Sequence, residues 1–527
     1  IAEYPTVITP QGRRKPDARQ AIIDQVNRGT LLLNFTGHGN PTVWAHESIL
    51  TLEDTKTQFF NNDRLAFVAA ATCDWGRFDA TDVQSSAEEM MKNQNGGAIG
   101  VLSATRAVYS TDNALLNYSF YGFAFPSSQF AGVPRLGDAF LLAKNDPSAG
   151  NLANREKYHL LCDPTLRLAS PRMAMTVDSI NGIATASTVP DTLGALQKVT
   201  IKGAIRKADL SVDPSVNGTA LVTVYDAERE KTIPGFSAPT FTYVQPGAVL
   251  YKGENSVVNG RLEATFIVPK DISYDNKNGK ISVYFSSGAS DGRGYTTNFM
   301  VGGTARGAAN DTKGPSISVY FDTPSFRSGD LVGETPKLIV ALSDSSGINS
   351  AGTGIGHRIE AWVDGSAKSI DLTEYYKSKR DSYQEGTVEY PMPKLDAGSH
   401  SVLVKAWDVY NNPSTAEASF TVASGSGLSL VNVYNIPNPA ARQTTFTFQH
   451  NQLTPLDVQI KIYSVAGRLI GEIDRYGVTD RFVQIPWDCR DNDGDALGNG
   501  VYFYRVTAKT VDGKFSSEAL GRLAVVK

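Results

Sequence analysis

The sequence predicts a multidomain protein in which one α/β domain precedes several all-β domains. The chain has 527 residues, and a typical domain has ~100–200, so we expect about three to five domains. Up to about residue 170, short apolar runs alternate with helical patterns. From Met173 onward, segments of alternating polar and apolar residues are separated by Gly, Asn, Asp and Pro clusters, a texture typical of antiparallel sandwiches.

The first region contains three strand-like runs, LLLNF (31–35), LAFVAAAT (65–72) and AIGVLSA (98–104). Alternation of such runs with helices predicts a largely parallel sheet. Ser85 or Ser86 is suited to cap the helix that follows, and the Asn-Gly-Gly of 95–97 is suited to end it. Further helical patterns at 111–123 and 136–146 precede a closing run, YHLLCDPTLRL, at 158–168.

Three strands are few for such a sheet, and the chain begins with IAEYP, which is neither an initiator Met nor a signal peptide. We therefore expect additional strands before Ile1. The predicted domains are an α/β domain at 1–170, a β-sandwich at 171–305, an immunoglobulin-like sandwich at 306–424 and a last all-β unit at 425–527. Gly-rich segments at 302–315 and 423–427 mark the two later boundaries.

Composition excludes several function classes. The net charge is -4 and no basic run occurs, so nucleic acid is not the expected partner. No stretch reaches the ~20 apolar residues of a membrane helix, and we expect a soluble chain. The three cysteines are far apart and form no Cys-x-x-Cys pair, which excludes a disulfide scaffold and a zinc ribbon. No phosphate loop or dinucleotide fingerprint is present, and we expect neither a cofactor nor a bound metal.

Two motifs fall at the ends of predicted strands. The first strand ends in Thr36-Gly37-His38-Gly39 and the second in Cys73-Asp74-Trp75-Gly76. Ligands bind at the carboxyl ends of the strands in open parallel sheets, so both motifs are expected at one edge. A thiol needs a neighbouring base to act as a nucleophile at neutral pH, and His38 is suited to supply it for Cys73. The backbone amides of Gly39 and Cys73 are then the expected oxyanion donors.

The alternative is that Cys73 is a small buried apolar residue and that His38 lies in an ordinary glycine turn. However, strand-GHG, a later strand-A-T-C-D, the run AIGVLSATRAVY and the closing C-D-P-T-L together resemble the gingipain-type (C25) cysteine peptidases of the caspase-like clan, over most of 30–168. The resemblance implies a caspase-like α/β fold in which His38 and Cys73 are catalytic. Cys162 departs from the Gly common in that family and is expected to be structural. The acidic partner of the His and part of the specificity pocket are implied to precede Ile1.

The last unit resembles the C-terminal sorting domain of type IX secretion cargo. The resemblance depends on five segments in order: VYNIPNPA (433–440), IYSVAGRLI (462–470), WDCRDNDG (487–494), GNGVYFYRV (498–506) and the final GRLAVVK. It implies passage through the outer membrane to the surface of a Bacteroidota-type bacterium. A generic immunoglobulin-like sandwich of the hook-capping kind shares the same turn and is the alternative.

The whole arrangement resembles the type IX secretion sortases, the PorU-like C-terminal signal peptidases, and the segment GIGHRIEAWVDG (354–365) supports this. The resemblance implies a cell-surface enzyme that removes the sorting domain of cargo proteins and transfers the cargo to an amine of anionic lipopolysaccharide. It also implies docking on an outer-membrane β-barrel shuttle protein. The alternatives are a secreted, purely hydrolytic gingipain-like endopeptidase and a non-catalytic surface scaffold or adhesin.

Other residues are given structural interpretations. His46 is expected in an exposed loop, with the cleft as the alternative, and His357 is expected to be structural. Trp75 is expected either to form a wall of the substrate groove or to pack under the nucleophile. Asp491, Asp493 and Asp495 are expected to form a β-turn, because Cys489 stands where an EF-hand loop needs its first acid.

Overall fold

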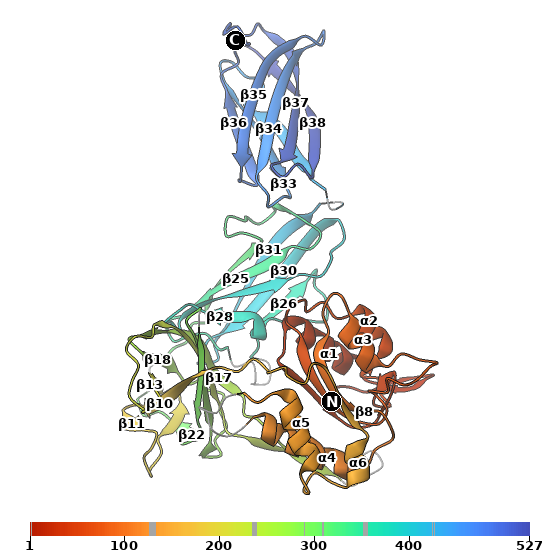
Figure 1. Ribbon diagram of the computed structural model, residues 1–527. Helices are drawn as coiled ribbons and strands as arrows, with labels where there is room; N and C mark the ends of the chain where they lie inside the picture. Colours follow the sequence, from red (N-terminus) through yellow and green to blue (C-terminus); the bar gives the residue numbers. More distant parts are fainter. Residues whose placement is uncertain are drawn as a thin grey trace. The chain divides into compact units, whose positions relative to one another are not determined.

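The computed structural model describes residues 1, 3–125, 133–233, 240–288, 290–307, 310–350, 357–423, 425 and 427–527. The chain forms two compact units. Unit 1 comprises Ile1–Ala174 with Thr232–Thr242 and Ser290–Gly292, and unit 2 comprises the rest (Figure 1). Parts of the predicted linkers and of the segment 354–365 lie outside the described residues.

Unit 1 is built on a four-stranded sheet of order β3-β7-β8-β9. The strands β3 (Leu32–Thr36), β7 (Ala66–Ala71) and β8 (Ala98–Ala104) are parallel, which confirms the prediction for these three runs. The closing strand β9 (Tyr158–Leu161) instead runs antiparallel to β8. The chain returns to the sheet at the edge where β8 ends, because the Thr105 amide, just after β8, donates to the Lys157 carbonyl, just before β9.

Helices cover both faces of this sheet (Figure 1). The buried side chains of β7 alternate between two cores: Val68 and Ala70 pack into one, and Phe67 and Ala69 into the other. The first core includes residues of α1 and α3, with α2 beside α3, and the second includes residues of α4 and α5. The helices are α1 (Pro16–Arg28), α2 (Leu52–Thr57), α3 (Ser86–Lys92), α4 (Ser110–Ala124), α5 (Leu136–Asn145) and α6 (Leu152–Glu156).

The start of α3 confirms the sequence prediction. Ser85 is the N-cap, and its hydroxyl and the Glu88 carboxylate form a reciprocal capping box. After the helix, Gly96 and Gly97 have φ values of 151° and 95°, which favour glycine. A Cβ on Gly97 would lie 2.0 Å from the Met90 carbonyl oxygen, so the Gly-Gly pair ends the helix by allowing a close turn.

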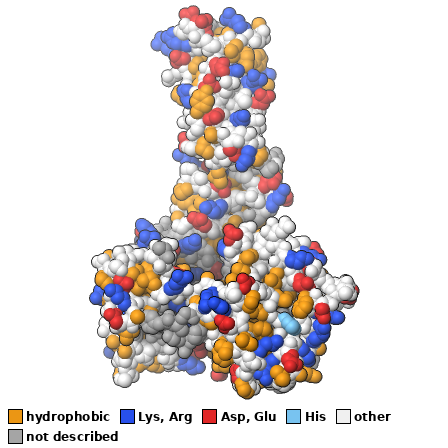
Figure 2. All heavy atoms as spheres, in the orientation of Figure 1, with side chains coloured by type: hydrophobic (Ala, Val, Ile, Leu, Met, Phe, Trp, Pro, Cys, Tyr) orange, Lys and Arg blue, Asp and Glu red, His pale blue; other side chains and the backbone are white. Residues whose placement is uncertain are grey.

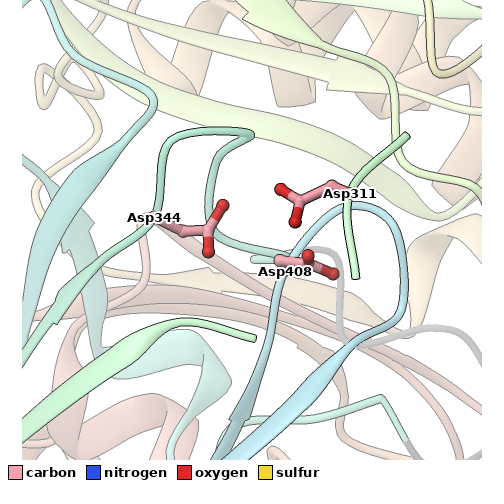
Figure 3. Close-up of side chains that lie close together, drawn as sticks. All are labelled: Asp311, Asp344 and Asp408. Carbon is pink, nitrogen blue, oxygen red and sulfur yellow. The ribbon is translucent and has the colours of Figure 1, made fainter. Parts of the chain in front are cut away.

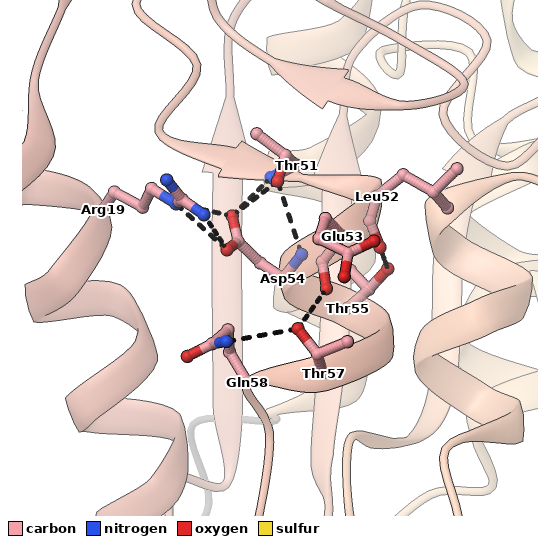
Figure 4. A network of polar contacts seen from close by, with 8 residues as sticks. All are labelled: Arg19, Thr51, Leu52, Glu53, Asp54, Thr55, Thr57 and Gln58. Carbon is pink, nitrogen blue, oxygen red and sulfur yellow. Dashed lines mark hydrogen bonds and ion pairs between the residues drawn. The ribbon is translucent and has the colours of Figure 1, made fainter.

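The helix α2 begins with a second capping box, which also anchors α1 (Figure 4). The fully buried Asp54 carboxylate accepts hydrogen bonds from the Thr51 amide and hydroxyl, at 2.9 and 2.8 Å. It also pairs with the Arg19 guanidinium, whose Nε lies 2.8 Å from Asp54 Oδ2. One carboxylate therefore satisfies donors from two helices.

We expect Asp54→Ala to destabilise this part of unit 1 by about 2–3 kcal/mol, because it removes a cap and leaves the Arg19 pair broken. Hydrogen exchange of the α1 and α2 amides measures this loss directly. Glu53→Ala, at an exposed neighbour in the same turn, is the control and is expected to change the exchange little. Equal protection in both variants would contradict the anchoring role.

Two small sheets of unit 1 were not predicted from the sequence. One is the hairpin of β1 (Val7–Thr9) and β2 (Gly12–Arg14). The other follows β3 directly and contains β4 (Gly39–Asn40), β5 (Val43–Trp44) and β6 (Leu50–Thr51). Strands of two residues are too short to show an alternating pattern, so periodicity could not reveal them.

From Met173 onward the chain forms a sheet of order β11-β10-β13-β18-β17-β14-β20-β21, in which β10 also pairs with β21 and most residues belong to unit 2. This pairing joins the two ends of the sheet, whereas the sequence predicted a sandwich for 171–305. Closure of the sheet pairs backbone N–H and C=O groups that the edge strands of an open sheet leave unpaired. The strands are β10 (Met173–Ile180), β11 (Ile183–Ala184), β13 (Lys198–Arg206), β14 (Gly218–Tyr225), β17 (Val249–Val258), β18 (Arg261–Ile267), β20 (Lys280–Ser286) and β21 (Asp291–Thr296).

Two smaller sheets accompany this one. The strands β12 (Thr192–Ala195), β22 (Met300–Thr304) and β19 (Lys277–Asn278) form the first, and β15 (Arg229–Ile233) and β16 (Phe241–Gln245) form the second.

The next region has two sheets around one core. The strands of the first sheet are β23 (Ser316–Phe321), β25 (Lys337–Ser343), β29 (Glu385–Pro391) and β28 (Tyr376–Ser378). Those of the second sheet are β24 (Leu331–Val332), β31 (Pro413–Val422), β30 (Gly398–Trp407), β26 (Glu360–Val363) and β27 (Ile370–Asp371). A 3-10 helix, Thr373–Tyr375, lies between β27 and β28 in the chain.

The last region is a second two-sheet sandwich with its own core. Its turn at 487–494 has the predicted form, because the Asp491 carboxylate accepts hydrogen bonds from the Asp493 and Asp495 amides at 3.1 and 2.8 Å. The strands are β32 (Leu430–Ile436), β33 (Thr444–His450) and β36 (Phe482–Trp487), and β35 (Leu469–Val478), β34 (Leu456–Ser464), β37 (Gly500–Thr510) and β38 (Ser516–Val525).

The surface carries both signs of charge. Figure 2 shows Lys and Arg interspersed with Asp and Glu over the face drawn, without a large patch of one sign. This distribution agrees with the near-balanced composition of 50 basic and 54 acidic residues. Among the described residues, no helix is long and apolar enough to cross a membrane.

Candidate active site

The two predicted motifs lie at the same edge of the unit 1 sheet. The strands β3 and β7 are parallel neighbours whose last residues, Thr36 and Ala71, are paired. The amide of Gly37 donates to the Ala71 carbonyl at 3.3 Å, so the turn that carries His38 begins against the end of β7. The turn that carries Cys73 begins one residue beyond that end, after Thr72. Parallel register thus brings the two turns together.

Cys73 lies in a sharp turn tied to the next strand. Its half-buried thiol accepts a hydrogen bond from the Val108 amide, with Sγ 3.4 Å from the nitrogen, and lies 3.5 Å from the Val108 carbonyl oxygen. Asp74 has φ 54°, a left-handed conformation that redirects the chain immediately after the thiol. The amide of Gly76 donates to the Ala104 carbonyl at 3.0 Å, which fixes the turn against the end of β8.

The glycines beside His38 permit a close approach of backbone to neighbouring atoms. A Cβ on Gly39 would lie 2.6 Å from Thr72 Oγ1 and 3.1 Å from the Val43 carbonyl oxygen. On Gly37 it would lie 2.9 Å from the Phe35 ring. The His38 turn therefore packs directly against the residue that precedes Cys73, and larger residues on either side would force it away.

We expect Gly39→Ala to lower kcat by about tenfold or more, because the added Cβ must displace the His38 turn from Thr72. Gly122→Ala is the matched control, since a Cβ on Gly122 meets no atom within 4 Å. The measurement is kcat for peptide cleavage by both variants. Unchanged kcat in Gly39→Ala would show that this close contact does not position the site.

The oxyanion donors proposed from the sequence are compatible with the backbone. The Ala45 amide donates to the His38 carbonyl at 2.8 Å. Gly39 and Trp44 therefore form a non-hydrogen-bonded pair, and the Gly39 amide faces away from β5. The Cys73 amide donates no hydrogen bond to another described residue. Among the described residues, these contacts therefore engage neither amide.

Aromatic residues pack beneath the two turns. Trp75 is fully buried, and its ring centroid lies 4.8 Å from that of Trp44. Trp44 in turn stacks on Phe35 at 4.5 Å. The structure thus selects the second interpretation of Trp75: its buried ring packs beneath the turn that carries Cys73 and forms no exposed wall.

Further charged and polar residues lie near the Cys73 turn, at Arg106 after β8 and at Tyr158 of β9. Arg106 pairs with Asp79 through Nη1 and Oδ1 at 3.0 Å, and the guanidinium lowers the pKa of the Asp79 carboxyl. Tyr158 is buried, and both burial and negative charge at Cys73 raise the pKa of its phenol. No motif pointed to Tyr158, because its proximity to Cys73 depends on the antiparallel placement of β9 beside β8.

Cys162 and Cys489 have environments unlike that of Cys73. Cys162 lies just after β9, where a Cβ on Gly100 would lie 2.7 Å from its Cβ, and burial raises the pKa of its thiol to about 11. Cys489 is buried in the last sandwich, and burial raises the pKa of its thiol as well. A thiol with a raised pKa is less ionised at neutral pH and is therefore a poorer nucleophile than an unperturbed thiol. The surroundings of Cys162 agree with the structural role expected for it.

Two histidines singled out in the sequence have different surroundings. His46 is exposed, but its ring centroid is 5.3 Å from that of His38. His357 belongs to unit 2, where its ring lies 4.4 Å from that of Trp407 and its Nδ1 contacts the Asp271 carboxylate. His357 thus packs as a structural residue, whereas His46 lies at the site.

Unit 2 contains a group of carboxylates suited in chemistry to a hard cation. One oxygen each of Asp311, Asp344 and Asp408 lies within 4.8 Å of the others (Figure 3). Burial raises the pKa of Asp344, with charge from Asp408 and Asp311 adding to the effect, and burial with the charge of Asp311 raises the pKa of Asp408. The three residues are far apart in sequence, so no spacing motif predicted this group.

A carboxyl with a raised folded-state pKa stabilises the fold below its unfolded value of ~3.9, and the contribution is lost as pH rises through the folded pKa. We therefore expect Asp344→Asn to raise the thermal stability of the protein at pH 8 in EDTA, and to raise it less at pH 4, because the raised pKa of Asp344 favours its neutral form as pH falls. Thermal unfolding of both proteins at both pH values measures this. Destabilisation at pH 8 would contradict repulsion within the group.

The edge described above carries a thiol and an imidazole, the two groups that cysteine-dependent enzymes use for acyl transfer. Residues 2–169 match the model of peptidase family C25. The match covers the sheet and both turns, and it agrees with the resemblance that the motifs of this segment carry.

Solved structures with similarity to the chain include dimeric latent PorU from Porphyromonas gingivalis, with 26% identity, 81% of this chain and 41% of that chain covered, and a TM-score of 0.35. Another is the Arg-specific cysteine proteinase gingipain R, with 17% identity, coverage of 54% and 55%, and a TM-score of 0.27. This chain thus spans less than half the length of the PorU structure. Both TM-scores are below 0.5. No curated protein matches the chain.

Proposed function

We propose that Cys73 is the nucleophile and His38 the general base of a cysteine peptidase. The observation that carries this proposal is the pairing of Thr36 with Ala71, which brings the Gly37–Gly39 and Thr72–Gly76 turns to one sheet edge. The two turns lie within the segment that matches family C25.

In the proposed mechanism, His38 accepts the proton of the Cys73 thiol, and the thiolate attacks the carbonyl carbon of a peptide bond. The amides of Gly39 and Cys73 donate to the oxyanion. His38 then gives its proton to the leaving amine as the C–N bond breaks, and a thioester to Cys73 remains. Attack by water yields a carboxylic acid, and attack by an amine yields a new amide; both regenerate the thiol.

We further propose that the substrates are type IX secretion cargo proteins, cut just before their C-terminal sorting domain, and that an amine of anionic lipopolysaccharide accepts the acyl group. The sequence of the last sandwich supports this class of substrate, since it carries the five sorting-domain segments in order. On this proposal the enzyme acts at the cell surface, on the outer face of the outer membrane. Its own last domain docks on a β-barrel shuttle protein.

Mass spectrometry of a cargo protein incubated with the full-length enzyme and an added amine tests the proposal. Cargo cut before its sorting domain and joined to the amine supports the sortase function, provided that Cys73→Ala gives no product. A cut with a free carboxylate only would favour the hydrolytic endopeptidase. Identical behaviour of wild type and Cys73→Ala would overturn both enzymatic functions and favour a scaffold.

A further inference from the structure

A second imidazole is held beside the proposed base. The ring centroids of His38 and His46 are 5.3 Å apart, with an interplanar angle of 55°. His46 lies between β5 and β6, whereas His38 lies between β3 and β4. Both side chains are exposed, so burial does not force them into contact. Their proximity is instead set by the backbone that carries them.

The loop that carries His46 is held in a costly conformation. Ala45 and Ser48 have φ values of 59° and 53°, in the left-handed region that costs a non-glycine residue about 1 kcal/mol or more. Such a conformation persists only where surrounding contacts determine it. Here two backbone bonds close the loop: Ser48 donates to the Ala45 carbonyl and Ile49 to the Trp44 carbonyl, both at 3.1 Å.

Further contacts fix the loop on both sides. The Ala45 amide, one residue before His46, donates to the carbonyl of His38 itself at 2.8 Å. Arg14 of β2 donates to the His46 carbonyl at 3.3 Å. Trp44 is buried and packs on Trp75, two residues after Cys73. The His46 ring is therefore positioned by the same framework as the two proposed catalytic residues.

We propose that His46 is a positioning residue, whose ring packs against the imidazole of His38 and limits its rotation so that it faces Cys73. This inference rests on the proposed function, because it requires His38 to be the base. A ring held beside the base lowers the orientational freedom that must be lost before proton transfer. It acts on the chemical step and leaves substrate binding nearly unchanged.

Charge gives a second consequence. Charged groups near His46 include Arg14, whose guanidinium donates to its carbonyl, the Arg13–Glu47 pair at 3.4 Å, and Lys15, whose amide donates to the Glu47 carbonyl, besides His38. During the reaction His38 carries a positive charge, so a cation at position 46 would repel it. A lysine there should therefore favour loss of the His38 proton. The alkaline limb of the kcat/KM profile would then move to lower pH.

The experiment compares four variants of the full-length protein in cargo cleavage: His46→Ala, His46→Phe, His46→Lys and Glu47→Gln. We expect His46→Ala to lower kcat about tenfold with KM nearly unchanged, and His46→Phe, which restores an aromatic ring, to recover most of it. His46→Lys should move the alkaline limb to lower pH. Glu47→Gln, on the same loop but paired with Arg13, should behave as wild type.

Unchanged kcat in His46→Ala, or equal loss in His46→Phe and His46→Ala, would overturn the inference. Near-ultraviolet circular dichroism of each variant shows whether a loss of kcat is due to unfolding. In that case the pH profile of His46→Lys decides between the two roles, because a purely structural role of His46 predicts no shift of the alkaline limb. Cys73→Ala in the same series distinguishes failure of the proposed function from failure of the inference about His46. If Cys73→Ala retains cleavage, the proposed function fails; if only the His46 variants behave as wild type, the dyad stands without a positioning residue.

Discussion

Cys73→Ala is expected to reduce peptide cleavage by about 10⁴-fold or more, to the background without enzyme. Alanine retains the turn, because its Cβ occupies the place of the cysteine Cβ, but it removes the atom that forms the thioester. The backbone contacts of Asp74 and Gly76 with the end of β8 do not involve the thiol and should persist. Cleavage of a sorting-domain cargo, followed by electrophoresis and mass spectrometry, measures the loss.

Cys162→Ala is the matched control, since it removes a thiol that burial makes less acidic and that lies at the end of β9. It is expected to retain cleavage within a few-fold of wild type. Retained activity in Cys73→Ala, or loss only in Cys162→Ala, would assign the nucleophile elsewhere and remove the basis of the proposed site.

His38→Ala is expected to lower kcat/KM by about 10³-fold, because no other base then accepts the thiol proton and none protonates the leaving amine. The amides of Gly39 and Cys73 remain, so some stabilisation of the oxyanion persists. The variant should also slow alkylation of Cys73 by iodoacetamide at pH 6, since the thiolate is the reactive form. Mass spectrometry of the peptide that contains Cys73 measures the alkylation without any substrate.

His400→Ala, which removes an imidazole that pairs with Asp364 in unit 2, serves as the control for loss of a histidine. It should leave cleavage and alkylation of Cys73 as in wild type. If His38→Ala retains alkylation at pH 6 and cleavage, then His38 does not activate the thiol, and the base must come from another residue.

Features that depend on residues close together in the sequence could be predicted from the sequence. Apolar runs followed by His38 and Cys73 predicted the adjacent ends of β3 and β7, because parallel strands share one edge. The Ser85 capping box was readable, since its partner Glu88 lies three residues on. The two-sheet sandwiches after residue 315 agree with the alternating segments predicted there.

Features that depend on long-range pairing could not be predicted in the same way. The direction of β9 is set by the path of the chain after β8, and the ring-like closure of the first unit 2 sheet depends on β10 meeting β21, more than a hundred residues apart. Whether Trp75 forms a wall of the substrate groove or packs under the Cys73 turn could be decided only from its contact with Trp44. Sequence alone predicts an exposed loop for His46, because the hairpin that returns it to His38 is made of two-residue strands.

The most direct test of the account is capture of the covalent intermediate. Full-length wild-type protein is mixed with a sorting-domain cargo, quenched with acid within seconds, digested and analysed by mass spectrometry. The account predicts that the cargo, cut before its sorting domain, is joined through a thioester to the peptide that contains Cys73, and that prior alkylation of Cys73 abolishes both this adduct and cleavage. Cleavage that continues with Cys73 fully alkylated would contradict it.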